Sequence, residues 1–344
     1  MLAAPQRHQI CLMAVLLFIA LALSLMAAFN QVKAMGLGWQ EANYLPILRN
    51  AAFEGGYDSN GLGPLVPSLV AIMTSAAESV GVPRASGSVL VVVRIGLNLT
   101  LMLVCLGYCR QLGIGKYAVV LGWAALAWSL THTTHQSTLA FDSTMEGILC
   151  MALAWACLAA RRSAAIAAAV GLILNGNAFL PMGIILLTMY APGGRPIHER
   201  LDRQTITRLA IIAGGAGLLL LAGGVRPEIA QQFRINLFST ETWLNLGLTF
   251  GVLPFLALLG WRKAPRSLQS TIALMLPFML IYRFALHDAA ATHGFIAPLV
   301  VCVLPLGLLA LEAAHPLPGE ARGTPVQGVH QPQLEPSCSL ETSG

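Results

Sequence analysis

Charged side chains are scarce in this sequence: Asp, Glu, Lys and Arg make up 10% of its 344 residues, whereas hydrophobic residues make up 56%. Soluble globular domains contain about 25% charged residues, which keep their surfaces hydrated. Together with a mean hydropathy of +0.71, this composition excludes an ordinary soluble domain and indicates that lipid surrounds most of the chain. The membrane bilayer is therefore the first partner that the sequence predicts.

Cysteine motifs and basic, aromatic-rich faces are missing as well. The seven cysteines form no Cys-x-x-Cys pair, and six of them lie in or beside apolar runs, which excludes a disulfide-rich scaffold. His132, His135 and His293 could be drawn as a metal site with His287 and Asp288, but the pattern is weak and we expect no zinc. The net charge of +5 is not interleaved with aromatic residues, so we expect no nucleic-acid partner.

Apolar runs of about 20 residues are abundant instead. Such a run matches the roughly 30 Å hydrocarbon core at 1.5 Å per helical residue, and the runs lack the alternating polarity of barrel strands. The predicted fold is an all-α polytopic membrane bundle of about eight spans, with the transmembrane domain at 1–313 and a disordered cytoplasmic tail at 314–344. The predicted spans are 9–29, 86–108, 115–133, 141–160, 205–224, 242–261, 268–284 and 294–313.

The apolar stretch 163–191 decides the topology. Its middle contains Asn175, Asn177 and Pro181, which would weaken a single helix inside a membrane. We therefore expect a broken hairpin of two short helices that enters and leaves on the same side. With this hairpin, the predicted cytoplasmic loops carry the excess of Lys and Arg that the positive-inside rule requires. The expected location is the cell inner (cytoplasmic) membrane, with both termini in the cytoplasm.

Acidic residues gather on the predicted outer face, chiefly in a large loop at 30–85 and at the start of the 141–160 span. Within the loop, 44–53 is expected to form a short helix and 65–80 a juxtamembrane helix along the interface. Long loops beside a membrane usually carry function. Capping of the helical bundle is the structural alternative.

The outer loop contains the sequence WQEANYL at 39–45 and GLGPL at 61–65. These motifs resemble the first outer loop of the GT-C superfamily of membrane glycosyltransferases, which includes the protein mannosyltransferases and the aminoarabinose transferase of lipid A. Glu41 and Tyr44 match the family pattern, while Gln40 stands where an Asp is usual. The resemblance implies catalysis at an outer-side cavity that begins with this loop.

Two further stretches are similar to the same family. The segment 135–155 resembles its fourth-span entry, where an Asp precedes an apolar helix, and this places Asp142 in the site. The segment 167–187 resembles its short helical pair. The resemblance covers about 9 to 191, without the soluble outer domain of many members. It implies transfer of a sugar from a polyprenyl-phosphate donor to an extracytoplasmic acceptor.

Such a transfer needs a carboxylate that takes the acceptor's proton and a cation that offsets the charge of the leaving phosphate. Glu41, Asp58 and Asp142 are the candidate catalytic carboxylates. They could also hold a divalent cation, and the cofactor is otherwise left open. Asp142 could instead cap the helix that follows it. The candidate substrate-binding residues are Tyr44, Arg49, Arg94, Glu146, Arg234, Arg283 and His287.

Two pairings are expected among these candidates. Arg94 lies well inside its predicted span, where an ionisable side chain is costly, and we expect it to pair with Glu146. Arg283 and His287 are four residues apart and share a helical face. The alternative function is a non-catalytic membrane protein, such as a transporter, a flippase component or a lipid-binding assembly partner, in which the outer loop is a cap and Arg94 pairs structurally.

Overall fold

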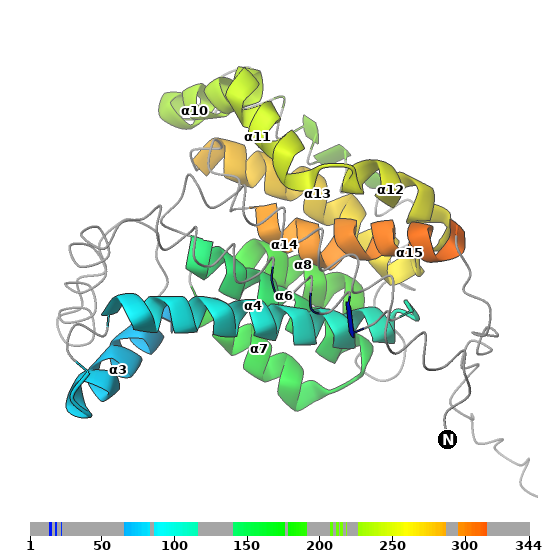
Figure 1. Ribbon diagram of the computed structural model, residues 1–344. Helices are drawn as coiled ribbons and strands as arrows, with labels where there is room; N and C mark the ends of the chain where they lie inside the picture. The colour runs from blue at the N-terminus through cyan, green and yellow to red at the C-terminus, as the bar shows by residue number, and fades with distance from the viewer. Residues whose placement is uncertain are drawn as a thin grey trace, which may run out of the picture.

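The computed structural model describes residues 65–82, 86–115, 140–175, 178–190, 226–286 and 295–314, together with isolated residues between 14 and 218. Every regular element in these residues is a helix (Figure 1). The elements are α3 (Leu65–Ser79), α4 (Ser86–Gln111), α6 (Ala140–Leu158), α7 (Arg162–Leu174), α8 (Phe179–Met189), α10 (Pro227–Phe238), α11 (Thr240–Phe250), α12 (Leu253–Gly260), η2 (Trp261–Lys263), α13 (Arg266–Leu286), α14 (Ile296–Pro298), η4 (Leu299–Val303) and α15 (Leu304–Ala314).

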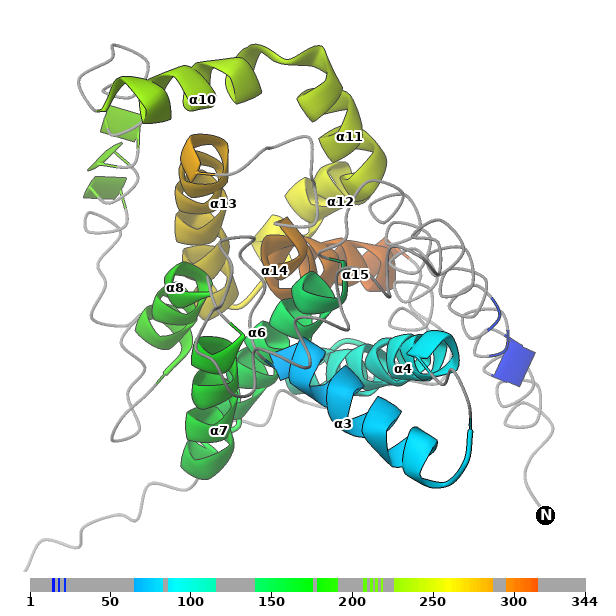
Figure 2. The same ribbon diagram turned by 90° about the vertical axis from the view of Figure 1, so that its left-hand side faces the viewer.

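Helix α6 and the continuous run from α14 to α15 occupy the centre of the described residues. Figures 1 and 2 show α3, α4 and α7 on one side of this centre and α10, α11 and α12 on the other, with α8 and α13 flanking it. Helix α6 packs against α4, α7, α8 and α14, so elements far apart in sequence meet on it. Any site formed by α6 is therefore assembled from distant parts of the chain.

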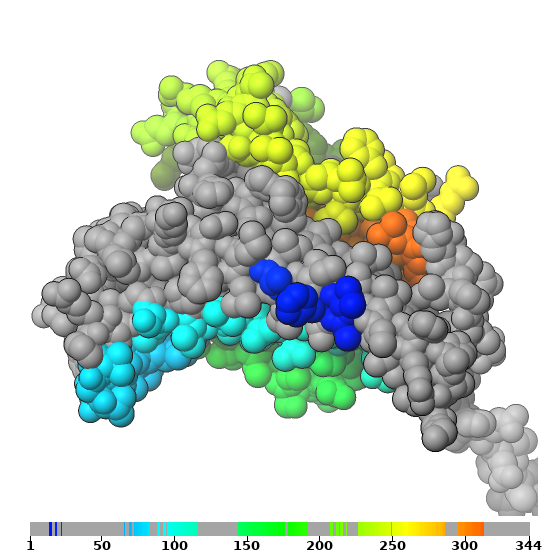
Figure 3. Space-filling view, viewed as in Figure 1, coloured from blue at the N-terminus to red at the C-terminus, as the bar shows by residue number. Residues whose placement is uncertain are grey.

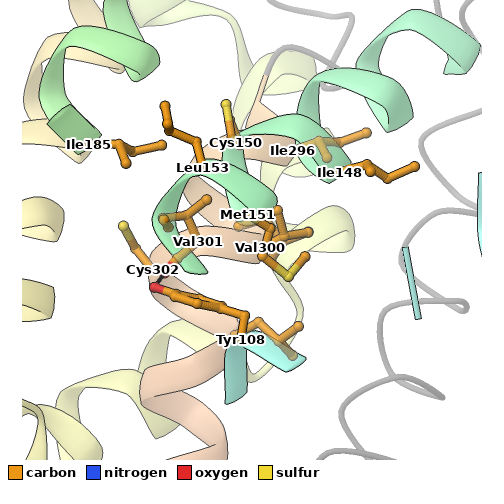
Figure 4. Packing of buried hydrophobic residues seen from close by; sticks show 14 of the residues in the cluster. Tyr108, Ile148, Cys150, Met151, Leu153, Ile185, Ile296, Val300, Val301 and Cys302 are labelled. Atoms are coloured by element: carbon orange, nitrogen blue, oxygen red, sulfur yellow. Dashed lines mark hydrogen bonds between the residues drawn. The ribbon is translucent and has the colours of Figure 1, made fainter. Parts of the chain in front are cut away.

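The main core consists of small and branched apolar side chains from these central helices. Met151 and Leu153 of α6 lie against Val300 and Val301 of η4 (Figure 4). The hydroxyl group of the fully buried Tyr108, at the end of α4, donates a hydrogen bond to the carbonyl oxygen of Val301 over 2.9 Å. This bond connects α4 to the centre of the fold. An apolar side chain in place of Tyr108 would leave the carbonyl oxygen of Val301 without this donor.

Glycines allow several of these helices to approach closely. A Cβ atom at Gly147 would lie 2.6 Å from Cγ2 of Ile296, and one at Gly107 would lie 2.6 Å from the ring of Trp155. A Cβ atom at Gly260 would overlap the carbonyl oxygen of Leu306. Small residues at helix contacts are the usual means of close packing in membrane bundles. Here they bring α14 onto α6, α6 onto α4, and α12 onto α15.

Several sequence predictions are confirmed within the described residues. Helices are present at the predicted spans 86–108, 141–160 and 268–284, and at the juxtamembrane segment 65–80. The stretch 163–191 is divided into α7 and α8, as its central Asn and Pro residues predicted. Apart from a few isolated residues, the predicted spans 9–29, 115–133 and 205–224 lie outside the described residues, as do most of the outer loop and the tail at 315–344.

The predicted span at 242–261 is divided into two helices. The chain forms α11 and α12 there, with a bend of 66° between them. Gly251 adopts a positive φ of 53°, which favours glycine, and Pro254 lies in the first turn of α12. Helix α10 was not predicted from the sequence, because its buried residues are separated by polar ones and form no apolar run.

Helices α10, α11 and α12 form one exposed end of the described residues (Figure 3). Patches of exposed apolar side chains on a protein mark surfaces that contact other molecules or lipid. The exposed large apolar residues of this end are Ile235, Phe238, Trp243, Leu244, Leu248, Val252, Phe255, Leu258 and Leu259. A lipid environment would remove the cost of leaving them in water.

By length and composition, one helix among the described residues could cross a membrane on its own, namely Arg266–Ala285. The bent pair Thr240–Leu248 and Leu253–Lys263 meets the same criterion as a unit. Four shorter apolar helices, of 10 to 17 residues, are also present among the described residues. The fold is therefore all-helical with one clear span-length apolar helix, and a bundle of about eight spans stays a prediction.

Candidate functional site

A buried ion pair connects α6 with α13. Nη2 of Arg283 lies 3.3 Å from each of the two carboxylate oxygens of Glu146. Only 6% of Arg283 and 7% of Glu146 are exposed, and they are the two charged residues that are buried in the described part of the chain. Taking a charge out of water costs on the order of several kcal/mol per ion, and the attraction within an ion pair offsets this cost only when its geometry is good. Such a pair is therefore a strong candidate for a functional site.

Helix α6 positions Glu146 inside the protein because the residues around it are apolar or small. Thr144, Ile148 and Cys150 are buried beside it. At Gly147, the absence of a side chain lets Ile296 of α14 pack directly on the backbone of α6. Helix α14 also packs against α13. Glu146 is thus enclosed where α6, α14 and α13 come together.

The end of α13 that carries Arg283 is fixed by α10 and α11. Nδ2 of the buried Asn236 donates a hydrogen bond to the carbonyl oxygen of Phe284 over 2.8 Å. This carbonyl lies in the last turn of α13, where backbone acceptors have no partner within the helix. The ring of Phe284 packs against Phe233, Trp243 and Phe295, at centroid distances of 6.2, 5.7 and 6.2 Å. These contacts hold the residue next to Arg283 and so limit where its guanidinium can lie.

The donors of Arg283 are used unevenly. Both oxygens of Glu146 accept from Nη2, while Nε is buried and has no hydrogen-bond partner among the described residues. Arginine usually offers two parallel N–H groups to a carboxylate. The arrangement here engages one nitrogen with the carboxylate and leaves another buried N–H group without an acceptor among the described residues.

The structure brings together two of the residues that the sequence predicted for the site, Glu146 and Arg283. Asp142 lies in α6 four residues before Glu146, and its side chain is outside the description. The described partner of Glu146 is Arg283 of α13, and the expected pair of Arg94 and Glu146 stays a prediction. Residue 94 lies in α4, whose side chain at this position is not described.

Of the six remaining predicted residues, the structure describes one, Arg234. Arg234 is exposed on α10. The other five lie outside the described residues, so their expected place in the site is untested: Glu41, Tyr44, Arg49, Asp58 and His287. The convergence of the outer loop on α6 therefore stays a prediction.

Sequence reasoning missed the residues that support Arg283. Asn236 belongs to α10, which the analysis did not predict, and Phe284 and Trp243 resembled ordinary apolar residues of a span. The signal that could have found Asn236 is an amide among buried apolar residues at helical spacing, Ala230 and Phe233. Nothing local in the sequence links this amide to the end of α13.

Within the described residues, no group of three or more His, Cys, Asp or Glu side chains could hold a metal ion. Two carboxylates, Glu146 and Asp142, come from one helix, and the arginine partner of Glu146 competes with a cation for its oxygens. A divalent ion, as the sequence analysis allowed, would need oxygen ligands from the outer loop.

No protein-family model, curated protein or solved structure matches this chain.

Proposed function

We propose that this chain is a membrane glycosyltransferase of the GT-C kind, which transfers a sugar from a polyprenyl-phosphate donor to an acceptor on the outer side of the inner membrane. The observation that supports it is the contact between Glu146 and Arg283. Both residues are among the substrate-binding candidates that the sequence predicts, although they are 137 positions apart.

The chemistry of the transfer fits the groups near this contact. The leaving polyprenyl phosphate gains negative charge as the glycosidic bond breaks, and a fixed guanidinium such as that of Arg283 stabilises that charge. A carboxylate must accept the proton of the acceptor hydroxyl group. Asp142 is the proposed base, one helical turn before Glu146, with Glu41 and Asp58 as further carboxylates from the outer loop.

The membrane setting is part of the same proposal. It is supported by the low charge content of the chain, by the span-length helix Arg266–Ala285 and by the apolar exposed end formed by α10, α11 and α12. Charged residues inside a membrane are costly, and they usually serve transport or catalysis. The proposed topology places both termini in the cytoplasm and Arg283 near the outer face.

A non-catalytic membrane protein is the second candidate, and the bend between α11 and α12 favours it. Discontinuous helices are a frequent feature of transporters, where they form substrate sites. In this case the ion pair of Glu146 and Arg283 would hold α6 and α13 together, and the protein would act as a transporter, flippase component or lipid-binding partner.

The two functions differ in turnover. The full chain, purified and reconstituted in liposomes with a panel of polyprenyl-phosphate sugars, should release polyprenyl phosphate when an acceptor is present. Asp142→Asn and Glu41→Gln should abolish this release, whereas Glu241→Gln, which changes an exposed carboxylate of α11, should not. Full activity of both Asp142→Asn and Glu41→Gln would rule out the proposed mechanism.

A further inference from the structure

Helix α12 and the turn that follows it present three kinds of exposed side chain in order. Phe255, Leu258 and Leu259 are 71%, 73% and 71% exposed. Trp261 follows with 37% of its surface exposed, and the exposed Arg262 comes next. In a bilayer, the hydrocarbon chains, the interface that attracts Trp and the charged headgroups follow one another in the same order. This surface therefore matches the profile of one membrane leaflet.

Helices α4 and α7 each carry an exposed apolar stripe that ends at an arginine. On α4, Leu103 is 63% exposed, and the exposed Arg110 lies seven positions later. On α7, the exposed Arg162 comes first, and the exposed Ile166 and Val170 follow it at intervals of four residues. Side chains at these spacings lie on the same face of a helix. An arginine at the end of such a stripe can lay its stem on apolar surface and extend its guanidinium to lipid phosphates.

Three contacts bring these arginines to the same end of the helices (Figure 1). The last turns of α4 and α6 touch at Gly107, and α6 leads directly into α7. The backbone N–H of Gly115, just after α4, donates a hydrogen bond of 3.0 Å to Oε2 of Glu312 in the last turn of α15. Helix α12 ends at Gly260, which lies against the backbone of α15. The ends of α4, α6, α12 and α15 and the start of α7 therefore lie together.

This end, the basic end, has an excess of positive charge over the residues that the structure describes. The carboxylate of Glu312 offsets one charge, and it already accepts the bond from Gly115. Clusters of Lys and Arg beside the apolar part of a membrane protein are attracted to anionic lipids. The exposed cations of the basic end are Arg110, Arg161, Arg162, Arg262, Lys263 and Arg266.

We infer that the basic end binds the phosphate groups of anionic phospholipids, with Arg110, Arg162 and Arg262 at the headgroups and the apolar stripes against the acyl chains. The inference rests on the proposed function only for the membrane setting, and it needs no sugar transfer. Arg266 begins α13 and Arg283 lies near its other end, so the basic end faces the cytoplasm in the proposed topology. A soluble acidic protein would match the charges but would leave the apolar stripes in water.

The experiment measures how tightly the full-length protein, purified in an uncharged detergent, binds dioctanoyl phosphatidylglycerol, an anionic phospholipid. Dioctanoyl phosphatidylcholine has the same acyl chains and no net charge, so it is the control ligand. Native mass spectrometry over a series of lipid concentrations gives both dissociation constants. We expect phosphatidylglycerol to bind at least about tenfold more tightly, since each Lys or Arg near a membrane surface contributes about fivefold. Equal affinity for the two lipids would overturn the inference.

Variants of the three arginines test their part in this preference. The triple variant Arg110→Gln/Arg162→Gln/Arg262→Gln should bind both lipids equally, whereas lysine at the same three positions keeps the charge and should keep the preference. Arg262→Gln alone should weaken phosphatidylglycerol binding by about fivefold. The matched control is Arg226→Gln, which changes an exposed arginine just before α10 and should bind as the wild type does. A folded triple glutamine variant with the full preference would contradict the assignment.

The wild-type protein supplies a second test, which applies if the triple variant does not fold. Its preference for phosphatidylglycerol should shrink as the NaCl concentration is raised, because salt screens exposed charges. A preference that does not change with salt would overturn the inference.

Polyglutamate, a soluble acidic polymer, separates a lipid from an acidic protein partner. It should leave phosphatidylglycerol bound at an equal concentration of negative charges, and displacement of the lipid would overturn the lipid assignment. The outcome is also separable from the proposed enzyme. A preference for phosphatidylglycerol without sugar release keeps this inference and removes the transferase, and sugar release by a protein without the preference does the reverse.

Discussion

The hydroxyl group of Tyr108 donates a hydrogen bond of 2.9 Å to the carbonyl oxygen of Val301. In an α-helix, this carbonyl would accept from the residue four positions later, which is Pro305 and has no N–H group. The chain instead widens into the π-helical turn η4 (Leu299–Val303). Tyr108 thus satisfies a carbonyl that a proline has left without its usual partner, and it connects α4 to the centre of the fold.

Tyr108→Phe should destabilise the protein by about 1–3 kcal/mol, because it leaves a buried carbonyl without a donor. The measurement is the free energy of unfolding, or the melting temperature, of the purified protein in detergent. Tyr190→Phe, which removes a half-buried hydroxyl group after α8, is the control and should change stability less. Equal stability of Tyr108→Phe and wild type would show that the bond does not hold η4.

Ala160→Gly should stabilise the protein by about 0.4–1 kcal/mol. Ala160 follows α6 with a φ of 54°, a left-handed conformation that costs a residue with a Cβ atom roughly 1–2 kcal/mol and that glycine adopts freely. The backbone bond from Arg161 N–H to the carbonyl of Ala156, 2.9 Å long, closes the helix there. Ala159→Gly, one residue earlier, should lower the melting temperature, and a fall for Ala160→Gly as well would contradict this account.

Gly147→Ala should destabilise the protein and disturb the site, because the new Cβ atom would lie 2.6 Å from Cγ2 of Ile296. Ile296→Ala removes that methyl group, so the double variant should be more stable than the sum of the two single effects predicts. A double-mutant cycle of unfolding free energies measures this coupling. Gly96→Ala, where a Cβ atom meets nothing within 4 Å, should stabilise α4 by up to about 1 kcal/mol. Additive effects of Gly147→Ala and Ile296→Ala would mean that the two helices do not touch as described.

Parts of the fold could be predicted from the sequence because they depend on local patterns. The runs that became α4, α6 and α13 are long and rich in apolar residues, and the break between α7 and α8 follows from Asn175 and Pro181. The bend at Gly251 was harder to predict, since a lone glycine is common within helices and its positive φ depends on the packing of α12 against α15. Helix α10 could not be predicted from an apolar run because it has none.

The candidate site, too, has a part that the sequence could predict and a part that it could not. Glu146 and Arg283 could be selected as candidates because a charge in an apolar run is costly wherever it lies. Their pairing could not be predicted, since sequence alone does not say which helices become neighbours, and Arg94 was an equally charged partner. Packing, with α14 lying against both α6 and α13, brings Arg283 to Glu146.

The central claim is that the ion pair of Glu146 and Arg283 serves transfer chemistry and is not needed for folding. Replacing both members of a buried pair with apolar residues of similar size is often neutral for stability, whereas removing one member costs about 3–5 kcal/mol. The most direct test is therefore polyprenyl-phosphate release by the Glu146→Leu/Arg283→Met double variant in liposomes, measured beside its unfolding free energy. We predict near wild-type stability with no release. A double variant that is folded and releases polyprenyl phosphate at the wild-type rate would contradict the claim.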